Sequence, residues 1–438
     1  MTTFPSELKI SKTEEQRGTV DQNEETIDAP YAGKLQVSVT SAIGMFPVEG
    51  ANVKIASTGD PQNQISELET DESGQTKVLD LQVPPLNWSL DPETLEQPYA
   101  EYNIEVTAKG YETVYVSGVQ VFADQLALQQ IRINPLETTE EEEKRVIIPV
   151  HTLFGEYPPK IPEEEIKDIP ETGEIVLSRV VIPEYVIVHD GVPQDSTARN
   201  YWVRYKDYIK NVLSCEIYAT WPEAAIYANA LVVMSFTLNR VYTEWYRNQG
   251  YDFTITSSTA YDQKWVYGHN IFENIDYLVD TIFANYLSRP GVRQPIFTSY
   301  CDGNRVSCDG LSQWGSKYLA EEGYTPIQII RYYYGNDMFI NTAEAISGIP
   351  SSWPGYDLKV GASGEKVRQL QVQLNRIARN YPAIPTISPD GIYGEATEEA
   401  VRTFQKIFKL PQTGVADYPT WYEISEIYVG VTRIAEPD

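Results

Sequence analysis

Residues 308–335 constrain the chain more than any other segment, because they carry the start and stop signals of two short helices together with unusual polar and aromatic side chains. Ser312 follows a glycine, and its hydroxyl can cap free main-chain donors, so it predicts a helix start. Gly323 predicts the end of that helix. Thr325 followed by a proline predicts a second helix, which runs to about residue 334.

The side chains of this helical pair suit a carbohydrate ligand. Sugar rings stack on aromatic faces, while their hydroxyl groups need amide and phenol partners for hydrogen bonds. The candidate residues for such a cleft are Ser312, Gln313, Trp314, Tyr332 and Tyr333. The same pattern is equally compatible with a structural helical hairpin that uses its aromatic rings for packing.

Residues 310–333 resemble the G-x-S-Q-W-G…I-L-x-x-Y-Y signature of the SpoIID/LytB family of peptidoglycan lytic transglycosylases. Residues 208–222 are similar to that family's Y-(I/V)-x-x-V-x-x-E-M-P-x-x-(F/W)-P element, and a long helix is expected over 223–245. The resemblance implies that Glu216 is the catalytic glutamate. Its apolar and aromatic neighbours would also desolvate the carboxyl and raise its pKa toward the range of a general acid. Taken alone, a Glu in such a stretch is more often a solvated surface residue.

The chemistry that the resemblance implies needs one carboxyl group. Glu216 would protonate the bond between N-acetylmuramic acid and N-acetylglucosamine, and would then deprotonate the muramoyl 6-hydroxyl as an anhydro ring closes. A muramidase-type hydrolase would need a second carboxylate, for which Asp262 is the candidate, although Asp in a polar run is commonly a turn residue. A binding protein without activity is a further alternative, because Met234 replaces an arginine of the family.

Two cysteines, Cys301 and Cys308, close a short loop before the helical pair. In an oxidising compartment this spacing favours a disulfide, and a pair of reduced thiols is the other form that we expect ahead of a metal site. Some members of the family hold zinc near this point, so a zinc site completed by His269 is the less favoured alternative, since the spacing is wider than in common zinc motifs. No other metal and no cofactor is expected.

Residues 34–136 alternate between apolar and polar positions in the manner of strands. Hairpin signals such as P-V-E-G-A-N-V at 47–53 resemble elements of carboxypeptidase-regulatory or transthyretin-like β-sandwiches. Residues 1–33 are a polar, acidic leader that lacks the basic start and apolar core of a secretory signal. We therefore expect a leader followed by a β-sandwich without a catalytic cluster. We also expect the protein to be synthesised without a signal peptide.

Residues 137–160 begin with an acidic run, which predicts a solvated linker. This linker is either an interdomain spacer or the activation site of a zymogen, because exposed linkers are where proteases cut. The second hypothesis places the cut within a short region composed of Lys144, Arg145, Val146, Ile147, Ile148, Pro149 and Val150. The catalytic domain is expected over 161–347.

After a further linker at 348–356, residues 357–438 resemble a helical peptidoglycan-binding domain. Apolar residues repeat there at helical spacing, and a D-G-I-Y-G turn at 390–394 joins two expected helices. Most of the apolar residues suit a core. Asp390 and Tyr393 are the candidate ligand residues of the turn.

The expected fold class is therefore multidomain α+β: an N-terminal β-sandwich, a central α+β catalytic domain and a small helical C-terminal domain. The length of 438 residues agrees with about three domains. The net charge of −28 argues against nucleic acid as a partner, and no run of eighteen apolar residues predicts a membrane span.

The order of the modules resembles the spore cortex-lytic enzymes of clostridia. That resemblance implies spore cortex peptidoglycan as the substrate and germination as the occasion of its cleavage. It further implies a stored pro-form in the cortex or coat region of the spore, and activation by a subtilisin-like protease.

Overall fold

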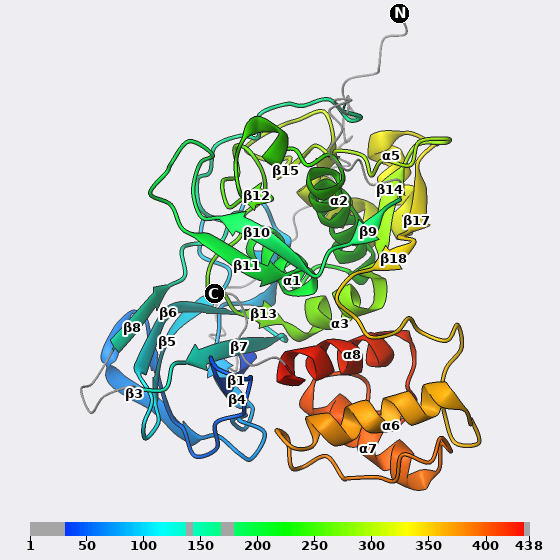
Figure 1. Ribbon diagram of the computed structural model, residues 1–438. Coiled ribbons are helices and arrows are strands. Elements are labelled where there is room, and N and C mark those ends of the chain that lie inside the picture. The colour runs from blue at the N-terminus through cyan, green and yellow to red at the C-terminus, as the bar shows by residue number, and fades with distance from the viewer. Residues whose placement is uncertain (1–30, 137–142, 168–178, 433–438) are drawn as a thin grey trace, which may run out of the picture. The chain divides into compact units, whose positions relative to one another are not determined.

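The computed structural model describes residues 31–136, 143–167 and 179–432 of the chain. Its N-terminal part forms two sheets with the strand orders β13-β7-β1-β4 and β3-β2-β5-β6-β8, in which β1 to β8 are coloured blue to teal in Figure 1 and β13, from later in the chain, is green. We call this part the two-sheet unit. Its elements are β1 (Ala32–Ser41), β2 (Asn52–Ser57), β3 (Asp60–Glu69), β4 (Leu79–Gln82), the 3-10 helix η1 (Leu86–Leu90), β5 (Ala100–Thr107), β6 (Thr113–Val121), β7 (Leu126–Ile133), β8 (Glu143–Ile147) and β13 (Ile271–Phe272).

The strand β5 illustrates why these residues form sheets. Tyr102, Ile104 and Val106 are buried, while the residues between them are partly exposed. Aromatic and β-branched side chains at every second position give a strand one apolar face, which is buried against the core. The strands expected over 34–136 are therefore present, and the assignment to transthyretin-like sandwiches stays a prediction.

Two strands from outside 34–136 complete the sheets. β8 pairs in parallel with β6, and β13 pairs antiparallel with β7. The linker expected at 137–160 is thus an edge strand over 143–147, because Val146 is buried and β6 offers a hydrogen-bonding edge. Residues 137–142, with most of the acidic run, lie outside the described residues, as do residues 1–30 of the expected leader. Since β13 belongs by sequence to the central region, the two regions share a sheet.

The central region is built around helices. They are α1 (Tyr205–Glu216), α2 (Glu223–Tyr242), the 3-10 helix η2 (Arg247–Gln249), α3 (Glu273–Ile282), α4 (Gln313–Glu321) and α5 (Pro326–Tyr334). Short strands surround them, namely β9 (Val181–Ile182), β10 (Tyr185–His189), β11 (Asn200–Arg204), β12 (Ile255–Thr256), β14 (Asn285–Ser288), β15 (Tyr300–Cys301), β16 (Leu311–Ser312), β17 (Phe339–Thr342) and β18 (Ala345–Ile346).

The long helix α2 is apolar on nearly all sides. Of the helices described, it is the one whose length and composition would suffice to cross a membrane, but 83% of its apolar window is buried inside the protein. A helix that is apolar all round and enclosed by protein is a core helix. α2 therefore organises the packing of the central region.

The predicted helical pair is confirmed as α4 and α5. The Ser312 hydroxyl accepts a 2.9 Å hydrogen bond from the main-chain N–H of Gly315, as a helix cap should. Gly323 follows α4 with a φ of 87°, the left-handed conformation that ends many helices. Thr325 precedes α5 and its first-turn proline.

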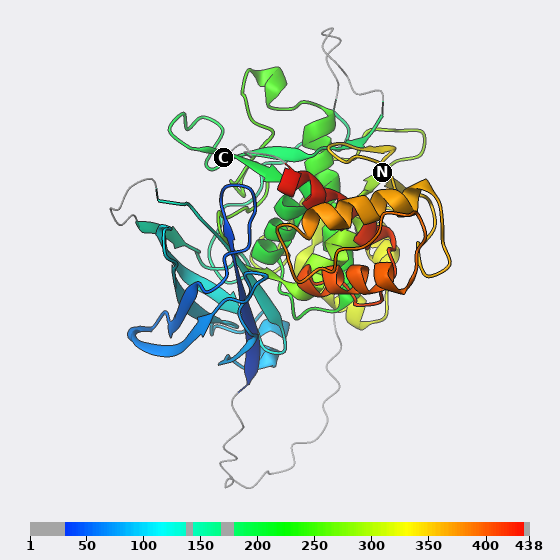
Figure 2. The same cartoon turned by 60° about the horizontal axis from the view of Figure 1, so that its bottom comes forward.

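The C-terminal part is a bundle of α6 (Glu365–Ile377), α7 (Glu395–Ile407) and α8 (Tyr418–Thr432), shown in orange to red in Figure 2. Residues at helical spacing, such as Leu370 and Leu374, form its core. The buried Lys206 of α1 connects this bundle to the central region, because its ammonium lies 2.5 Å from Glu423 and 2.7 Å from Glu426 of α8.

Candidate active site

Glu216 lies at the end of α1 and faces a cavity of about 440 Å³. α1 is buried on nearly all sides, so its last residue is held inside the protein and is only 4% exposed. Ile217 adopts an extended conformation and ends the helix. The cavity is lined by Thr152, Leu153, Glu156, Tyr157, Pro158, Pro159, Lys160, Glu216, Thr259, Tyr300, Cys301, Asp302, Arg305, Val306 and Gln313.

The Glu216 carboxyl is poorly satisfied by the protein around it. Oε1 accepts a 2.7 Å hydrogen bond from the main-chain N–H of Lys264, whereas Oε2 has no well-formed hydrogen bond among the described residues. Burial raises the pKa of Glu216 above its ordinary value, and the Lys160 ammonium, the Lys264 N–H and the Tyr300 hydroxyl offset part of this rise. Glu216 therefore keeps its proton to a higher pH than a solvated glutamate does, as a general acid requires.

Lys160 is a functional candidate that sequence reasoning missed. Its ammonium donates to the main-chain oxygen of Asp262 and lies 4.6 Å from the centroid of the Tyr300 ring. Burial lowers the pKa of Lys160, while the charges of Glu216 and Asp262 act in the opposite direction. The residue lies in a stretch whose composition predicts a linker, and no motif marks it.

Cys301 and Cys308 form a disulfide, as their spacing favoured. In this structure their sulfurs are bonded to each other, and the zinc alternative stays a prediction. His269 is buried, and its Nδ1 lies 2.5 Å from the main-chain oxygen of Asn270. No group of three or more potential metal ligands occurs among the residues that the structure describes.

The disulfide loop and residues 152–160 together form a wall of the Glu216 cavity. The Arg305 guanidinium donates to the main-chain oxygens of Thr152, Phe154 and Gly155 at 2.6–3.1 Å. Arg305 is itself paired with Asp302 at 3.1 Å. Residues 152–160, which were expected to be part of a spacer, are therefore held by hydrogen bonds at the Glu216 cavity. The loop that holds them, residues 301–308, is closed by the disulfide.

The candidate residues of the helical pair differ in whether they line the Glu216 cavity. Gln313 lines the Glu216 cavity, and Ser312 caps α4. Trp314 was expected to face the cleft, but it is 4% exposed and packs into an aromatic cluster with its ring 4.9 Å from a neighbouring indole. The Tyr333 hydroxyl interacts with Ser312, and Tyr332 is 60% exposed outside the cavity lining. The hairpin thus contributes one side chain to the cavity and uses its indole for packing.

Asp262 is fully buried and does not line the cavity. Its Oδ1 accepts a 2.7 Å hydrogen bond from Nε of Arg240. Its Oδ2 accepts hydrogen bonds from the Tyr246 hydroxyl at 2.6 Å and from the main-chain N–H and hydroxyl of Thr256 at 2.9 and 2.7 Å. This arrangement makes Asp262 a counter-ion of a buried arginine, with both of its oxygens engaged in hydrogen bonds.

In the C-terminal bundle, the turn at 390–394 joins α6 to α7. Asp390 is exposed, and its Oδ1 accepts hydrogen bonds from the Ile392 N–H and the Gln371 amide, which stabilise the turn. Tyr393 is 1% exposed and donates to the main-chain oxygen of Gly414, so it belongs to the core. Ile392, 60% exposed, is the side chain that the turn presents to solvent.

Two regions of the chain match known families. Residues 194–278 match the Stage II sporulation protein family, SpoIID, and residues 363–424 match the putative peptidoglycan binding domain family. The first range contains Glu216, and the second contains the turn at 390–394. The chain therefore carries a SpoIID domain and a C-terminal peptidoglycan-binding domain. The chain thus combines a region similar to a sporulation protein family with a region similar to a peptidoglycan-binding family.

Individual proteins match smaller parts of the chain. The chain is 39% identical over 77 residues to a zinc D-Ala-D-Ala carboxypeptidase of Streptomyces albus G, and this match spans 17% of the chain and 28% of that enzyme. A minor pilin of Streptococcus agalactiae is 14% identical with a TM-score of 0.18, over 25% of this chain and 48% of the pilin. Catechol 1,2-dioxygenase of Pseudomonas arvilla C-1 is 15% identical with a TM-score of 0.19, over 27% of this chain and 57% of the dioxygenase. TM-scores this low support no functional inference.

Proposed function

We propose that this protein is the zymogen of a peptidoglycan lytic transglycosylase that degrades spore cortex during germination, as a clostridial cortex-lytic enzyme of the SleC type. Glu216 is the catalytic acid and base in this proposal. The supporting observation is a single poorly satisfied carboxyl with a raised pKa, which faces a cavity inside the region that matches SpoIID.

In the proposed reaction, the Glu216 proton passes to the oxygen of the bond between N-acetylmuramic acid and N-acetylglucosamine. The bond from that oxygen to C1 breaks, and oxocarbenium character develops on the muramic acid ring. The Glu216 carboxylate then takes the proton of the 6-hydroxyl, whose oxygen bonds to C1 and closes the anhydro ring. Lys160 and Tyr300 favour the carboxylate form that this second stage uses.

The alternative of a muramidase-type hydrolase needs a second carboxylate about 5 to 9.5 Å from the first. Asp262 has its oxygens occupied, as described above. Asp302 lines the cavity, but its oxygens accept hydrogen bonds from main-chain N–H groups of its own loop and from Arg305. Glu156 is exposed at the cavity. The engaged oxygens of Asp262 and Asp302 support the transglycosylase, and Glu156→Gln tests the remaining carboxylate of the cavity.

The alternative of a wall-binding protein without activity rests on Met234, which is completely buried in α2. The same helix carries Arg240, whose guanidinium is buried against Asp262 and Glu163. An arginine therefore remains on α2 in a structural position. The missing family arginine gives little support to a loss of activity.

The proposed activation is a cut by a subtilisin-like protease within residues 144–150. Ile147 and Val150 are 77% and 44% exposed, and β8 has a sheet partner on one side only. A cut at this point breaks the covalent connection between β1–β7 and residues 152–160, which stay with the Glu216 cavity, as does β13. We propose the cortex or coat region of the spore as the place where the pro-form is stored.

Digestion of spore-cortex sacculi by the processed protein, followed by mass spectrometry of the muropeptides, separates the three functions. Anhydro ends support the transglycosylase, reducing ends indicate a hydrolase, and the absence of released fragments indicates a binding protein. Glu216→Gln should lower release by about 10²- to 10⁴-fold, the usual contribution of a general acid, while binding to sacculi persists. Glu156→Gln is the matched control and should retain activity.

Activation is tested by comparing the intact chain with the same chain nicked within residues 144–150. The nicked protein should release muropeptides faster. Equal rates for the two forms would contradict the zymogen proposal and leave the assignment of Glu216 intact.

A further inference from the structure

A second cavity of about 440 Å³ lies between the two-sheet unit and the central region, and it shares no lining residue with the Glu216 cavity. Its walls come from β6, β7 and β8 on one side, and from β10, β11, α1 and residues 265–271 on the other. The reaction proposed above does not use it. The side chains that line it are nevertheless unusual for a gap between two packed units.

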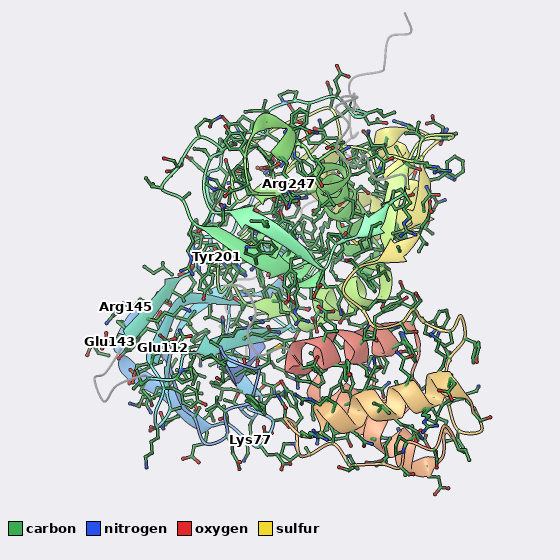
Figure 3. The ribbon with its side chains drawn as sticks, viewed as in Figure 1. Lys77, Glu112, Glu143, Arg145, Tyr201 and Arg247 are labelled. Carbon is green, nitrogen blue, oxygen red and sulfur yellow. A yellow bond between two sulfur atoms is a disulfide. The ribbon has the colours of Figure 1, made fainter. Side chains whose placement is uncertain are left out.

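Large aromatic rings form one wall of this second cavity. The Tyr201 ring lies 5.3 Å from that of Trp265 and 5.0 Å from that of Tyr267, centroid to centroid. Trp202, which is 45% exposed, also lines the cavity. Figure 3 labels Tyr201 on the central region, where that region faces the two-sheet unit. Adjacent rings of this kind provide the faces on which sugar rings stack.

Two cations flank the aromatic wall. The Lys144 ammonium lies 5.0 Å from the Tyr267 centroid and donates to the Tyr267 hydroxyl at 2.6 Å. The Arg199 guanidinium lies 5.0 Å from the Tyr201 centroid. Within the described part of the chain, neither cation lies within 4 Å of a carboxylate. In a protein with a net charge of −28, such cations are available for a carboxylate of a ligand.

A buried acceptor completes the site. Gln129 is 1% exposed and lines the cavity, and its Nε2 donates to the main-chain oxygen of Gly268 at 3.0 Å. Its Oε1 is buried without a hydrogen-bond partner among the described residues. A buried acceptor left in this way costs free energy, which a hydroxyl or amide donor of a ligand would recover.

The acidic groups near the cavity do not cancel its cations. Asp207 lines the cavity, and burial raises its pKa, while the charges of Lys210, Arg204 and Arg132 offset part of this rise. Lys210 is itself paired with Asp276 and Asp280, whereas Arg204 and Arg132 also line the cavity. Asp190 lies near Tyr201 and accepts a hydrogen bond from the Ser257 hydroxyl. The balance therefore favours an anionic ligand over a cationic one.

We propose that this second cavity binds an anionic saccharide, namely a muramic-acid glycan fragment that carries a short peptide with free carboxylates. A sugar ring would lie against Tyr201 and Tyr267, and a carboxylate would lie between Lys144 and Arg199. Because Lys144 belongs to β8, the ligand would also hold that strand in place and slow a cut beside it. This last consequence rests on the proposed activation of the zymogen.

The test is a calorimetric titration of the intact chain with N-acetylglucosaminyl-N-acetylmuramoyl-L-alanyl-D-isoglutamate, which lacks the bond that the proposed reaction cleaves. Lys144→Gln and Arg199→Gln should each weaken binding about tenfold, since each removes one charge-assisted hydrogen bond. Arg145→Gln is the matched control, because Arg145 is the next residue of β8, is 69% exposed and lies over Tyr115. Figure 3 shows Arg145 and Glu143 at the outer edge of the sheet.

Two further arms identify the chemistry recognised. Neutral N,N′-diacetylchitobiose and the free dipeptide should each bind at least tenfold more weakly than the disaccharide dipeptide. Trypsin cleavage after Lys144 and Arg145 should be slowed by the disaccharide dipeptide in the unsubstituted protein, but much less in Arg199→Gln.

The proposal fails if the intact chain shows no binding, if all three compounds bind equally, or if Lys144→Gln and Arg199→Gln bind as well as Arg145→Gln. A loss of binding in Glu216→Gln would place the ligand in the Glu216 cavity and would equally overturn it. Cleavage of sacculi by the processed protein is a separate readout, so failure here is distinguishable from failure of the proposed function.

Discussion

Two buried carboxyl groups near Lys160 differ sharply in how the protein treats them. Asp262 accepts hydrogen bonds from Arg240, Tyr246 and Thr256, and it does not line the Glu216 cavity. Among the residues that the structure describes, Glu216 accepts a hydrogen bond from the Lys264 N–H on Oε1, its Oε2 has no well-formed hydrogen bond, and it faces a cavity. Burial is therefore common to both, and the supply of donors distinguishes a structural carboxylate from a candidate acid.

The difference has a physical origin in the neighbouring helix. Arg240 is completely buried on α2, and a buried guanidinium needs a counter-ion with well-aligned oxygens. Asp262 meets this need, so its charge is required for stability. Among the described residues, Glu216 forms no ion pair within 4 Å with an arginine, so its proton is available for exchange with a substrate.

The largest expected effect on stability comes from replacing Asp262, the structural carboxylate of this pair. Asp262→Asn should lower the free energy of unfolding by about 3 kcal/mol, because it removes one of the two carboxylates, Asp262 and Glu163, that neutralise the buried Arg240. Urea denaturation followed by circular dichroism measures this change. Glu156→Gln, on an exposed carboxylate, should stay within about 0.5 kcal/mol of the unsubstituted protein. A loss below about 1 kcal/mol for Asp262→Asn would contradict the structural role.

The disulfide between Cys301 and Cys308 closes a loop at the Glu216 cavity. Replacing Cys301 and Cys308 together with serine should cost about 2 kcal/mol, since a short loop loses its cross-link. Muropeptide release should fall as well, because Arg305 of that loop fastens residues 152–160 over the cavity. Full activity of the double variant would show that the cavity wall does not depend on this loop.

Glu216→Gln should change the free energy of unfolding in the opposite direction to Asp262→Asn. We expect it to raise this free energy by about 1 kcal/mol at neutral pH. The folded protein binds the Glu216 proton more tightly than the unfolded chain does, because burial raises the pKa. The contribution of this group to stability is fully present below the ordinary glutamate pKa, and is lost as pH rises through the folded pKa. The stabilising effect of glutamine should therefore disappear at acidic pH, and thermal melts across pH measure it. A variant that is less stable than the unsubstituted protein at neutral pH would show that the Glu216 carboxylate is well accommodated.

The smallest expected effect is a displacement of the pH profile in Lys160→Met. The Lys160 charge lowers the pKa of Glu216, so its removal should raise that pKa further. Since the first step needs protonated Glu216, activity declines as pH rises through this pKa, and the decline should move to higher pH in the variant. Muropeptide release measured across pH gives the profile. An unchanged alkaline limb would mean that Lys160 does not influence the acid.

Sequence reasoning was accurate where the cause of a structure is local. Ser312 and Gly323 predicted the bounds of α4 to within a few residues, and the spacing of Cys301 and Cys308 favoured the disulfide that is present. The same reasoning misjudged Trp314, whose position in the first turn of α4 leaves open whether it faces a cleft or the core. Nothing within that turn decides between these two environments.

By itself, the sequence determined the helix and strand signals, the loop closed by cysteines, and the resemblance that singled out Glu216. These depend on residues a few positions apart, or on a motif held within one segment. Only the tertiary structure decided that residues 143–147 complete a sheet, that Asp262 serves Arg240, and that Lys160 reaches Glu216. Those outcomes depend on contacts between distant segments, where burial and the supply of hydrogen-bond partners govern the role of each charged group.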